Sequence, residues 1–192
     1  DRSVRRRMLD SLAKLNEKHF SEIGDPEIQT TIAQQEMAFR MQASVPELTD
    51  ISKESKEAMD LYGPDVHKPG SFARNCLLAR RMAQRDVRFI QLFHRGWDHH
   101  TGIVNFMKNH CCPSVDHAIA GLITDLRRRG LFKDTLIVWG GEFGRTPDNN
   151  RRGGVYAIGR GHNADAMTML MAGGGVKRGA IVGATDEIGA HE

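Results

Sequence analysis

Apolar residues recur at helical spacing in the first part of the chain. Val4, Met8 and Leu12 lie four positions apart and so share one face of a helix. No strand-like alternation interrupts this pattern, and two further helical stretches continue it. The pattern predicts a helical region over residues 1–62 that packs on the rest of the protein.

The second of these helices carries a start signal and a stop signal. Asp25 and Pro26 are an aspartate cap followed by proline at the first helical position. The residue before a proline disfavours helical conformation, so Val45-Pro46 is expected to end this helix near residue 43.

After about residue 62 the pattern changes to alternating helices and strands. Short apolar runs predict strands at 87–93, 135–139 and 167–172, with a fourth candidate at 180–182. A strand, a helix and a strand in this order form a right-handed crossover with parallel strands. Residues 63–192 are therefore expected to form an α/β domain with a mostly parallel sheet flanked by helices.

Composition is that of an ordinary soluble globular protein. The chain has 192 residues, 40% of them hydrophobic and 27% charged, and a net charge of +3. This charge is too small to indicate nucleic-acid binding, and the arginine clusters are expected to be solvated. No run approaches the roughly 20 apolar residues that span a bilayer. The cysteines, Cys76, Cys111 and Cys112, do not form a disulfide framework.

Carboxylates and imidazoles lie next to the predicted strands. Asp98, His99 and His100 follow the first strand, Glu142 lies in a glycine-rich turn after the second, and His162 precedes the third. In an extended segment Asp98 and His100 project to the same side and His99 to the other. Oxygen and nitrogen ligands suit zinc first, with manganese, calcium or iron as alternatives.

Asp98, His100, Glu142 and His162 are therefore the candidate ligands of a divalent metal ion. The alternative for each is a structural role, in which the carboxylates and histidines cap helices or hydrogen-bond within loops.

Two arginines are candidates for binding an anionic substrate. Arg145 and Arg160 lie at the two ends of a long, polar, glycine-rich loop at 144–161. A planar guanidinium suits a phosphate or sulfate oxyanion. An ion pair between Arg145 and Glu142 is the alternative.

No catalytic nucleophile is assigned. Cys111 and Pro113 fit the start of the Cys-x-Pro-x-Arg pattern in which sulfatases mature a cysteine, but position 115 is valine. Pro113 is also explained by the start of an amphipathic helix.

Four segments of the chain resemble one known family, DUF1501, which is often labelled sulfatase-like and is similar to the alkaline phosphatase superfamily. The helical stretch from about 27 to 85 resembles the family's middle region as well. The four segments are Arg95-Gly96-Trp97-Asp98-His99-His100, Trp139-Gly140-Gly141-Glu142-Phe143-Gly144-Arg145-Thr146-Pro147, Gly159-Arg160-Gly161-His162-Asn163 and Ala172-Gly173-Gly174-Gly175-Val176-Lys177.

The resemblance implies a metal-dependent hydrolase of phosphate or sulfate monoesters that acts on a small anionic ester. It supports the same four candidate ligands but departs at Gly161, where the family usually shows an aspartate. It also implies an incomplete alkaline phosphatase-like sheet, a middle-to-C-terminal fragment and an exported or periplasmic protein. The alternative is a non-catalytic, degenerate relative that binds an anion or a partner protein. The oligomeric state stays open.

Overall fold

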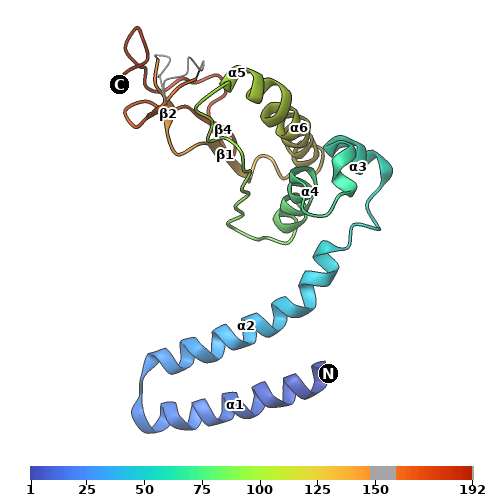
Figure 1. Ribbon diagram of the computed structural model, residues 1–192. Coiled ribbons are helices and arrows are strands. Elements are labelled where there is room, and N and C mark those ends of the chain that lie inside the picture. Colours follow the sequence, from blue (N-terminus) through green and yellow to red (C-terminus); the bar gives the residue numbers. More distant parts are fainter. Residues whose placement is uncertain (148–158, 192) are drawn as a thin grey trace. The chain divides into compact units, whose positions relative to one another are not determined.

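The computed structural model describes residues 1–147 and 159–191, which form two compact units (Figure 1). The first unit is Asp1–Lys53 and the second is Glu54–Glu192. The centre of the predicted loop at 144–161, residues 148–158, lies outside the described residues.

The first unit is a hairpin of two helices, α1 (Arg2–Ile23) and α2 (Pro26–Thr49). Gly24 ends α1 with a left-handed φ of 75°, and its N–H donates to the Phe20 carbonyl at 2.7 Å. Asp25 caps α2 by accepting from the Glu27 N–H at 2.9 Å. The start predicted at Asp25-Pro26 is therefore confirmed.

The predicted end of α2 near residue 43 is wrong, because α2 continues through Pro46 to Thr49. The proline removes one backbone donor but leaves the next turn intact. The Thr49 hydroxyl donates to the Val45 carbonyl at 2.9 Å, and the Asp50 N–H donates to the Pro46 carbonyl at 3.0 Å. These bonds complete the last turn of the helix.

Helices also form most of the regular secondary structure of the second unit. Their bounds are α3 (Lys56–Tyr62), the 3₁₀ turn η1 (Pro64–His67), α4 (Phe72–Ala83), α5 (Ile103–Phe106), the π-helical turn η2 (Met107–Cys111) and α6 (Cys112–Arg128). Helices α3, α4 and α6 pack together around Tyr62, Leu77, Val115 and Leu126, each at most 2% exposed. A β-carbon at Gly121 would lie 2.1 Å from the Leu61 carbonyl oxygen, so glycine permits the close approach of α3 and α6.

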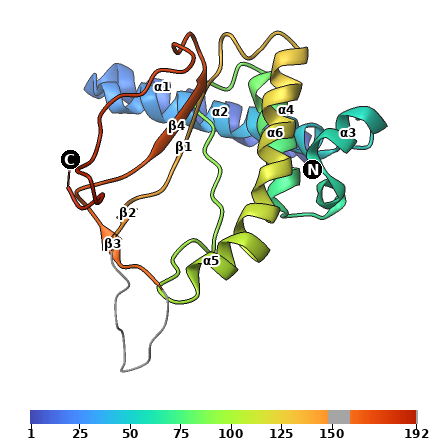
Figure 2. The same ribbon diagram turned by 90° about the horizontal axis from the view of Figure 1, so that it is seen from above.

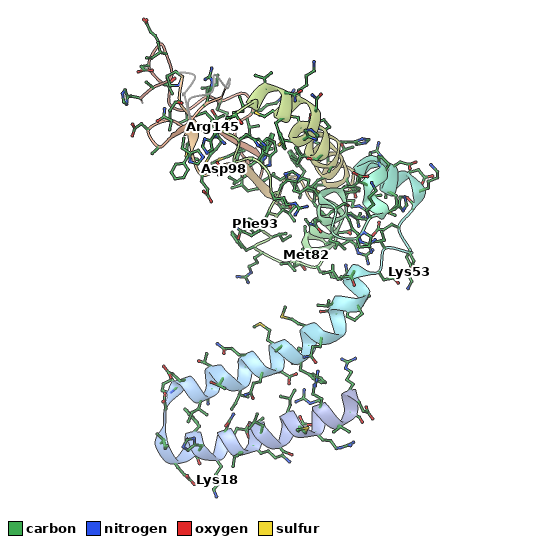
Figure 3. The ribbon with its side chains drawn as sticks, in the orientation of Figure 1. Lys18, Lys53, Met82, Phe93, Asp98 and Arg145 are labelled. Atoms are coloured by element: carbon green, nitrogen blue, oxygen red, sulfur yellow. The ribbon has the colours of Figure 1, made fainter. Side chains whose placement is uncertain are left out.

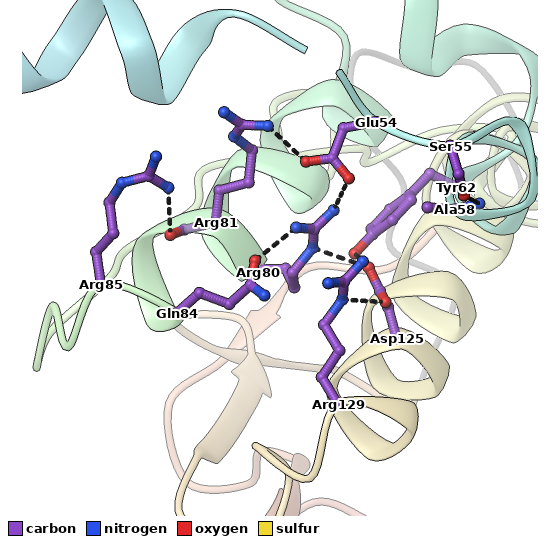
Figure 4. A network of polar contacts seen from close by, with 10 residues as sticks. All are labelled: Glu54, Ser55, Ala58, Tyr62, Arg80, Arg81, Gln84, Arg85, Asp125 and Arg129. Carbon is purple, nitrogen blue, oxygen red and sulfur yellow. Dashed lines mark hydrogen bonds and ion pairs between the residues drawn. The ribbon is translucent and has the colours of Figure 1, made fainter. Parts of the chain in front are cut away.

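A network of buried charges joins the same helices (Figure 4). Asp125 of α6 is paired with Arg80 Nε at 2.8 Å and Arg129 Nε at 2.7 Å. The Tyr62 hydroxyl donates to Asp125 Oδ2 at 2.9 Å, and the same oxygen is paired with Arg80. Arg80 also pairs with Glu54. Buried guanidinium groups need such partners, because an uncompensated charge is costly to remove from water.

The charge network also sets the pKa of Glu54. Burial by itself would raise the pKa of this carboxyl, but hydrogen bonds from Arg80 and Arg81 outweigh burial and leave the pKa below its ordinary value. Glu54 is therefore ionised in the folded protein at neutral pH.

The strands form two small antiparallel sheets, so the predicted parallel sheet is wrong. Strand β1 (Leu136–Gly140) pairs with β4 (Met169–Gly173), with Val138 opposite Met171. Strand β2 (Gly144–Arg145) pairs with β3 (His162–Asn163). Figure 2 shows β1 and β4 side by side, with β2 and β3 beyond one end of them. Strands were predicted close to β1 and β4, but the apolar pattern does not specify the direction in which strands pair.

The strands predicted at 87–93 and 180–182 are also wrong, since both segments are irregular. Their apolar residues are largely solvent-exposed: Phe89 is 82% exposed and Ile181 is 92% exposed. A β-branched or aromatic run stabilises a strand only where it packs on a half-buried sheet. The described part of the second unit is thus a helical layer with two small two-stranded antiparallel sheets, rather than an α/β domain.

The helix Lys56–Tyr62, which the sequence grouped with the N-terminal helical region, belongs to the second unit. Among the helices that the structure describes, none combines the length and the apolar character needed to cross a membrane.

Candidate metal centre

The segment between α4 and α5 is irregular and is held by side chains from the helical layer. The Trp97 indole N–H donates to His94 Nδ1 at 2.8 Å. The Cys111 thiol donates to the Gly96 carbonyl at 3.0 Å, and His99 Nε2 contacts the same sulfur at 3.3 Å. Because the thiol donates its hydrogen to Gly96, its sulfur accepts from His99. His99 therefore faces the helices.

Asp98 and His100, on either side of His99, face the opposite direction, as the alternation predicts. The Asp98 carboxylate meets both His100 and His162, and the ligand atoms of these three residues all lie within 4.8 Å of one another. Asp98 Oδ1 lies 3.0 Å from His100 Nε2 and 2.8 Å from His162 Nε2. Two imidazoles therefore converge on one carboxylate oxygen.

The short β2–β3 pair places His162 at this point. Arg145 and His162 are opposite each other in the register. The Thr146 N–H donates to the Gly161 carbonyl at 3.1 Å, and the Gly161 N–H donates to the Thr146 hydroxyl at 2.9 Å. The ring of Phe143 stacks on His162, with centroids 5.5 Å apart.

The position of His100 is fixed by close packing of its backbone against Gly159. A β-carbon at Gly159 would lie 1.6 Å from the His100 carbonyl oxygen, so only glycine lets these segments touch. His100 Nδ1 lies 3.2 Å from the Arg160 carbonyl. Since a carbonyl only accepts, Nδ1 carries a hydrogen, and Nε2 is the nitrogen left to bind a metal.

The charges around Asp98 favour its ionised form. The hydrogen bond from His162 lowers the pKa of the Asp98 carboxyl and outweighs the opposing effect of burial, and the nearby charges of His100 and Arg145 lower the pKa further. The side chain of Asp98 is 73% exposed, whereas His100 is 23% exposed. The cluster thus opens to solvent on the side of the carboxylate.

The remaining predicted site residues lie in other surroundings. Glu142 follows β1 and is exposed, and it is not one of the three residues whose ligand atoms converge. Arg145 uses its guanidinium for backbone carbonyls: Nη2 donates to Trp97 O at 2.6 Å and Nη1 to His99 O at 2.8 Å. In Figure 3, Asp98 and Arg145 lie next to each other. Arg160 is exposed, and its Nη1 donates to Thr146 O at 3.3 Å.

Cys111 lacks the exposure and the lowered thiol pKa of an activated nucleophile. It is 3% exposed, and burial, with a smaller effect of Cys112, raises the pKa of its thiol. A raised pKa keeps the thiol protonated at neutral pH, and the protonated form is a poor nucleophile.

Two contributors to this cluster were missed by sequence reasoning, namely Phe143 and the Arg160 carbonyl. Phe143 had a signal, since it follows the candidate Glu142 directly and is an aromatic residue in a glycine-rich turn. The carbonyl had none, because a backbone contact leaves no mark on residue identity.

The described residues form a largely helical protein with a carboxylate–imidazole cluster built from one loop and the short strand β3. The whole chain, residues 1–192, matches the family described as "Protein of unknown function (DUF1501)". The chain belongs to this family, as its motifs indicate. No curated protein and no solved structure matches it.

Proposed function

We propose that Asp98, His100 and His162 bind one divalent metal ion, zinc in the first place, and that the protein hydrolyses phosphate or sulfate monoesters with it. The observation that supports the metal best is that Asp98 Oδ1 lies 3.0 Å and 2.8 Å from the two Nε2 atoms, and that one ligand atom of each residue lies within 4.8 Å of the others. One oxygen and two nitrogens are a common donor set for zinc. A relation to the sulfatase-like and alkaline phosphatase-like proteins is part of this proposal.

The distances between the carboxylate and the imidazoles are close to those between ligands of one metal ion. Ligands of a tetrahedral zinc with bonds of about 2.0–2.1 Å lie roughly 3.3 Å apart. Asp98 Oδ1 is 2.8 Å from one imidazole nitrogen and 3.0 Å from the other. A shift of the exposed Asp98 by a few tenths of an ångström away from both rings, together with a closer approach of the ligand atoms that lie up to 4.8 Å apart, would admit the ion.

The surroundings of His100 also support a cation. Its Nδ1 faces the Arg160 carbonyl, which can only accept a hydrogen bond, and its Nε2 lies 3.0 Å from the Asp98 carboxylate. A cation between His100 and Asp98 would let the neutral ring keep its hydrogen bond to Arg160 and bind through Nε2. Such a carbonyl partner is typical of metal-ligating histidines.

Three protein ligands would leave at least one position for water or substrate, as in catalytic rather than structural zinc sites. A bound divalent cation would supply a water of lowered pKa and neutralise charge on the transferred group. Asp98 would contribute negative charge, and His162 would keep its orientation by stacking on Phe143. Arg160, exposed and with a long hydrogen bond of 3.3 Å, is the arginine best able to turn towards an anion.

One observation favours the alternative of a binding module without catalysis. The Arg145 guanidinium donates to backbone carbonyls and so does not point its donors at a substrate. Such a module would keep the metal and bind an anion or a protein without turnover.

A pair of measurements separates these functions. Isothermal titration with Zn²⁺ tests the site: His100→Ala and His162→Ala should each weaken binding at least about tenfold. The matched control is His191→Ala, which removes a histidine that pairs with an exposed aspartate, Asp165, at 3.4 Å. Unchanged zinc affinity in the two site variants would reject the metal site.

Turnover of an aryl phosphate and an aryl sulfate, with zinc and with a chelator, tests catalysis. Chelator-sensitive turnover that is lost in His162→Ala supports the hydrolase. Zinc binding without turnover of either ester supports the binding module.

A further inference from the structure

Resting on the proposed metal site, we propose that Arg145 is the positioning residue of that site, which its guanidinium assembles from two separate loops. The Asp98 and His100 ligands lie in the loop before α5, whereas His162 lies in β3, more than sixty positions along the chain. Two loops without a shared helix or sheet need a bridge if their ligands are to stay within reach of one ion.

The backbone of Arg145 fixes the position of β3, the strand that carries His162. Arg145 lies in β2 directly opposite His162, so the ladder sets the position of His162 relative to the arginine. Its side chain then extends from β2 to the loop that holds Asp98.

The guanidinium fixes the loop that carries Asp98, and it does so on both sides of this residue. Nη2 donates to the Trp97 carbonyl at 2.6 Å, and Nη1 donates to the His99 carbonyl at 2.8 Å. These carbonyls precede and follow the Asp98 residue, so the planar fork sets the direction in which its side chain projects. Two carbonyls held by one rigid fork are a geometry that arginine provides and lysine does not.

A third acceptor links the guanidinium to His100. Nη1 also lies 3.4 Å from the Arg160 carbonyl, and His100 Nδ1 lies 3.2 Å from the same oxygen. Arg145 therefore contacts the partner that orients His100, as well as the loop of Asp98 and the strand of His162. It is thus linked to the backbone around all three candidate ligands without offering a ligand itself.

The charge of Arg145 and its positioning role predict opposite changes in metal affinity when this arginine is removed, so the role is testable. A cation near a metal site repels the metal, so deleting the positive charge should strengthen binding if electrostatics dominated. Loss of positioning should weaken it. Mutations of groups that orient metal ligands typically cost about 10–100-fold in affinity.

The experiment is a Co²⁺ titration of the wild-type protein and of Arg145→Gln and Arg145→Lys, followed by the visible ligand-field bands of bound cobalt. We expect the Kd for Co²⁺ to rise about 10–100-fold in both variants, with altered bands. Arg128→Gln, which removes one positive charge from an exposed position on α6, is the control and should leave both readouts unchanged. Tryptophan fluorescence without metal shows whether each variant is folded.

Each outcome decides one question. Wild-type affinity and bands in Arg145→Lys would overturn the positioning role, because the ligands would then be held as well without the planar fork. Tighter binding in Arg145→Gln would overturn it as well. If neither variant folds, Arg145 is a determinant of the fold and the positioning role is rejected. If the wild type does not bind Co²⁺ at all, the proposed metal site fails, and the role of Arg145 fails with it.

Discussion

Replacing Asp125 by asparagine should destabilise the second unit strongly without changing its shape. The Asp125 side chain is 4% exposed, forms an ion pair with Arg80 Nε at 2.8 Å, and accepts from Arg129 Nε at 2.7 Å and the Tyr62 hydroxyl at 2.9 Å. Asparagine keeps the volume but removes the charge and puts an N–H₂ group where donors already converge. Removing one partner of a buried ion pair typically costs about 3–5 kcal/mol.

The surroundings place the expected cost at the lower end of this range. Arg80 keeps its pairing with Glu54, and the side chain of Arg129 is 33% exposed and can turn to water. The remaining oxygen of the asparagine can still accept from Tyr62. We therefore expect a loss of about 3 kcal/mol in the free energy of unfolding, from a total that is about 5–15 kcal/mol for a typical domain.

Urea unfolding followed by tryptophan fluorescence measures this loss in the relevant unit. The chain has two tryptophans, Trp97 and Trp139, and both lie in the second unit. With a urea m-value of about 2–3 kcal/mol/M, the midpoint should fall by roughly 1–1.5 M. The control is Asp60→Asn, which breaks the exposed pair with Lys56 at 2.6 Å and should leave the midpoint unchanged.

A graded comparison strengthens the test. Tyr62→Phe removes one hydrogen bond to the same carboxylate and should cost about 1.5–3 kcal/mol, less than Asp125→Asn. If Asp125→Asn and Asp60→Asn shifted the midpoint equally, the carboxylate would not be buried and paired as described, and the reasoning would be refuted.

Three further predictions concern Glu54, Gly159 and the cysteines. Because the folded state lowers the pKa of Glu54, its contribution is present above the unfolded value of about 4.3 and is lost as the pH falls through the folded pKa. The stability difference between wild type and Glu54→Gln should therefore shrink below about pH 4.3 in urea titrations, and a constant difference down to full acid unfolding would contradict this. Gly159→Ala would set a β-carbon 1.6 Å from the His100 carbonyl oxygen and should weaken Co²⁺ binding at least about tenfold; unchanged affinity would show that the contact is dispensable. Cys76 is 0% exposed, and burial raises the pKa of its thiol to about 12. It should therefore not react with a disulfide reagent until the protein unfolds, whereas the partly exposed Cys112 should react first. Prompt labelling of Cys76 would count against the packing of α4.

Local signals in the sequence predicted local structure well. The Asp25-Pro26 cap begins α2, and the apolar run at 135–139 lies within one residue of β1. Both depend on interactions between near neighbours, which a linear pattern records. The direction of strand pairing depends on contacts between distant segments, and here β1 pairs antiparallel with β4.

The segment at 87–93 shows why an apolar run is not sufficient evidence for a strand. Val87 and Phe93 fit the pattern, yet Phe93 is 79% exposed and the segment is irregular. Hydrophobicity favours burial but does not provide the neighbouring strand that burial in a sheet requires.

The sequence indicated which residues of the cluster lie together better than it indicated the contacts that hold them. The alternation around His99 separates it from Asp98 and His100, and the structure places it against Cys111 instead. The contacts of Arg145 were not predictable, because backbone carbonyls as acceptors are invisible in a sequence. Its residue type suggested an oxyanion instead.

Diffraction from crystals of the protein soaked in zinc, collected at the zinc absorption edge, locates the bound ion. We expect one strong anomalous peak about 2.0–2.2 Å from Asp98 Oδ1, His100 Nε2 and His162 Nε2. A zinc peak bound by other residues, such as His99 with Cys111, or zinc-loaded crystals without a peak at Asp98, would contradict the proposed metal site.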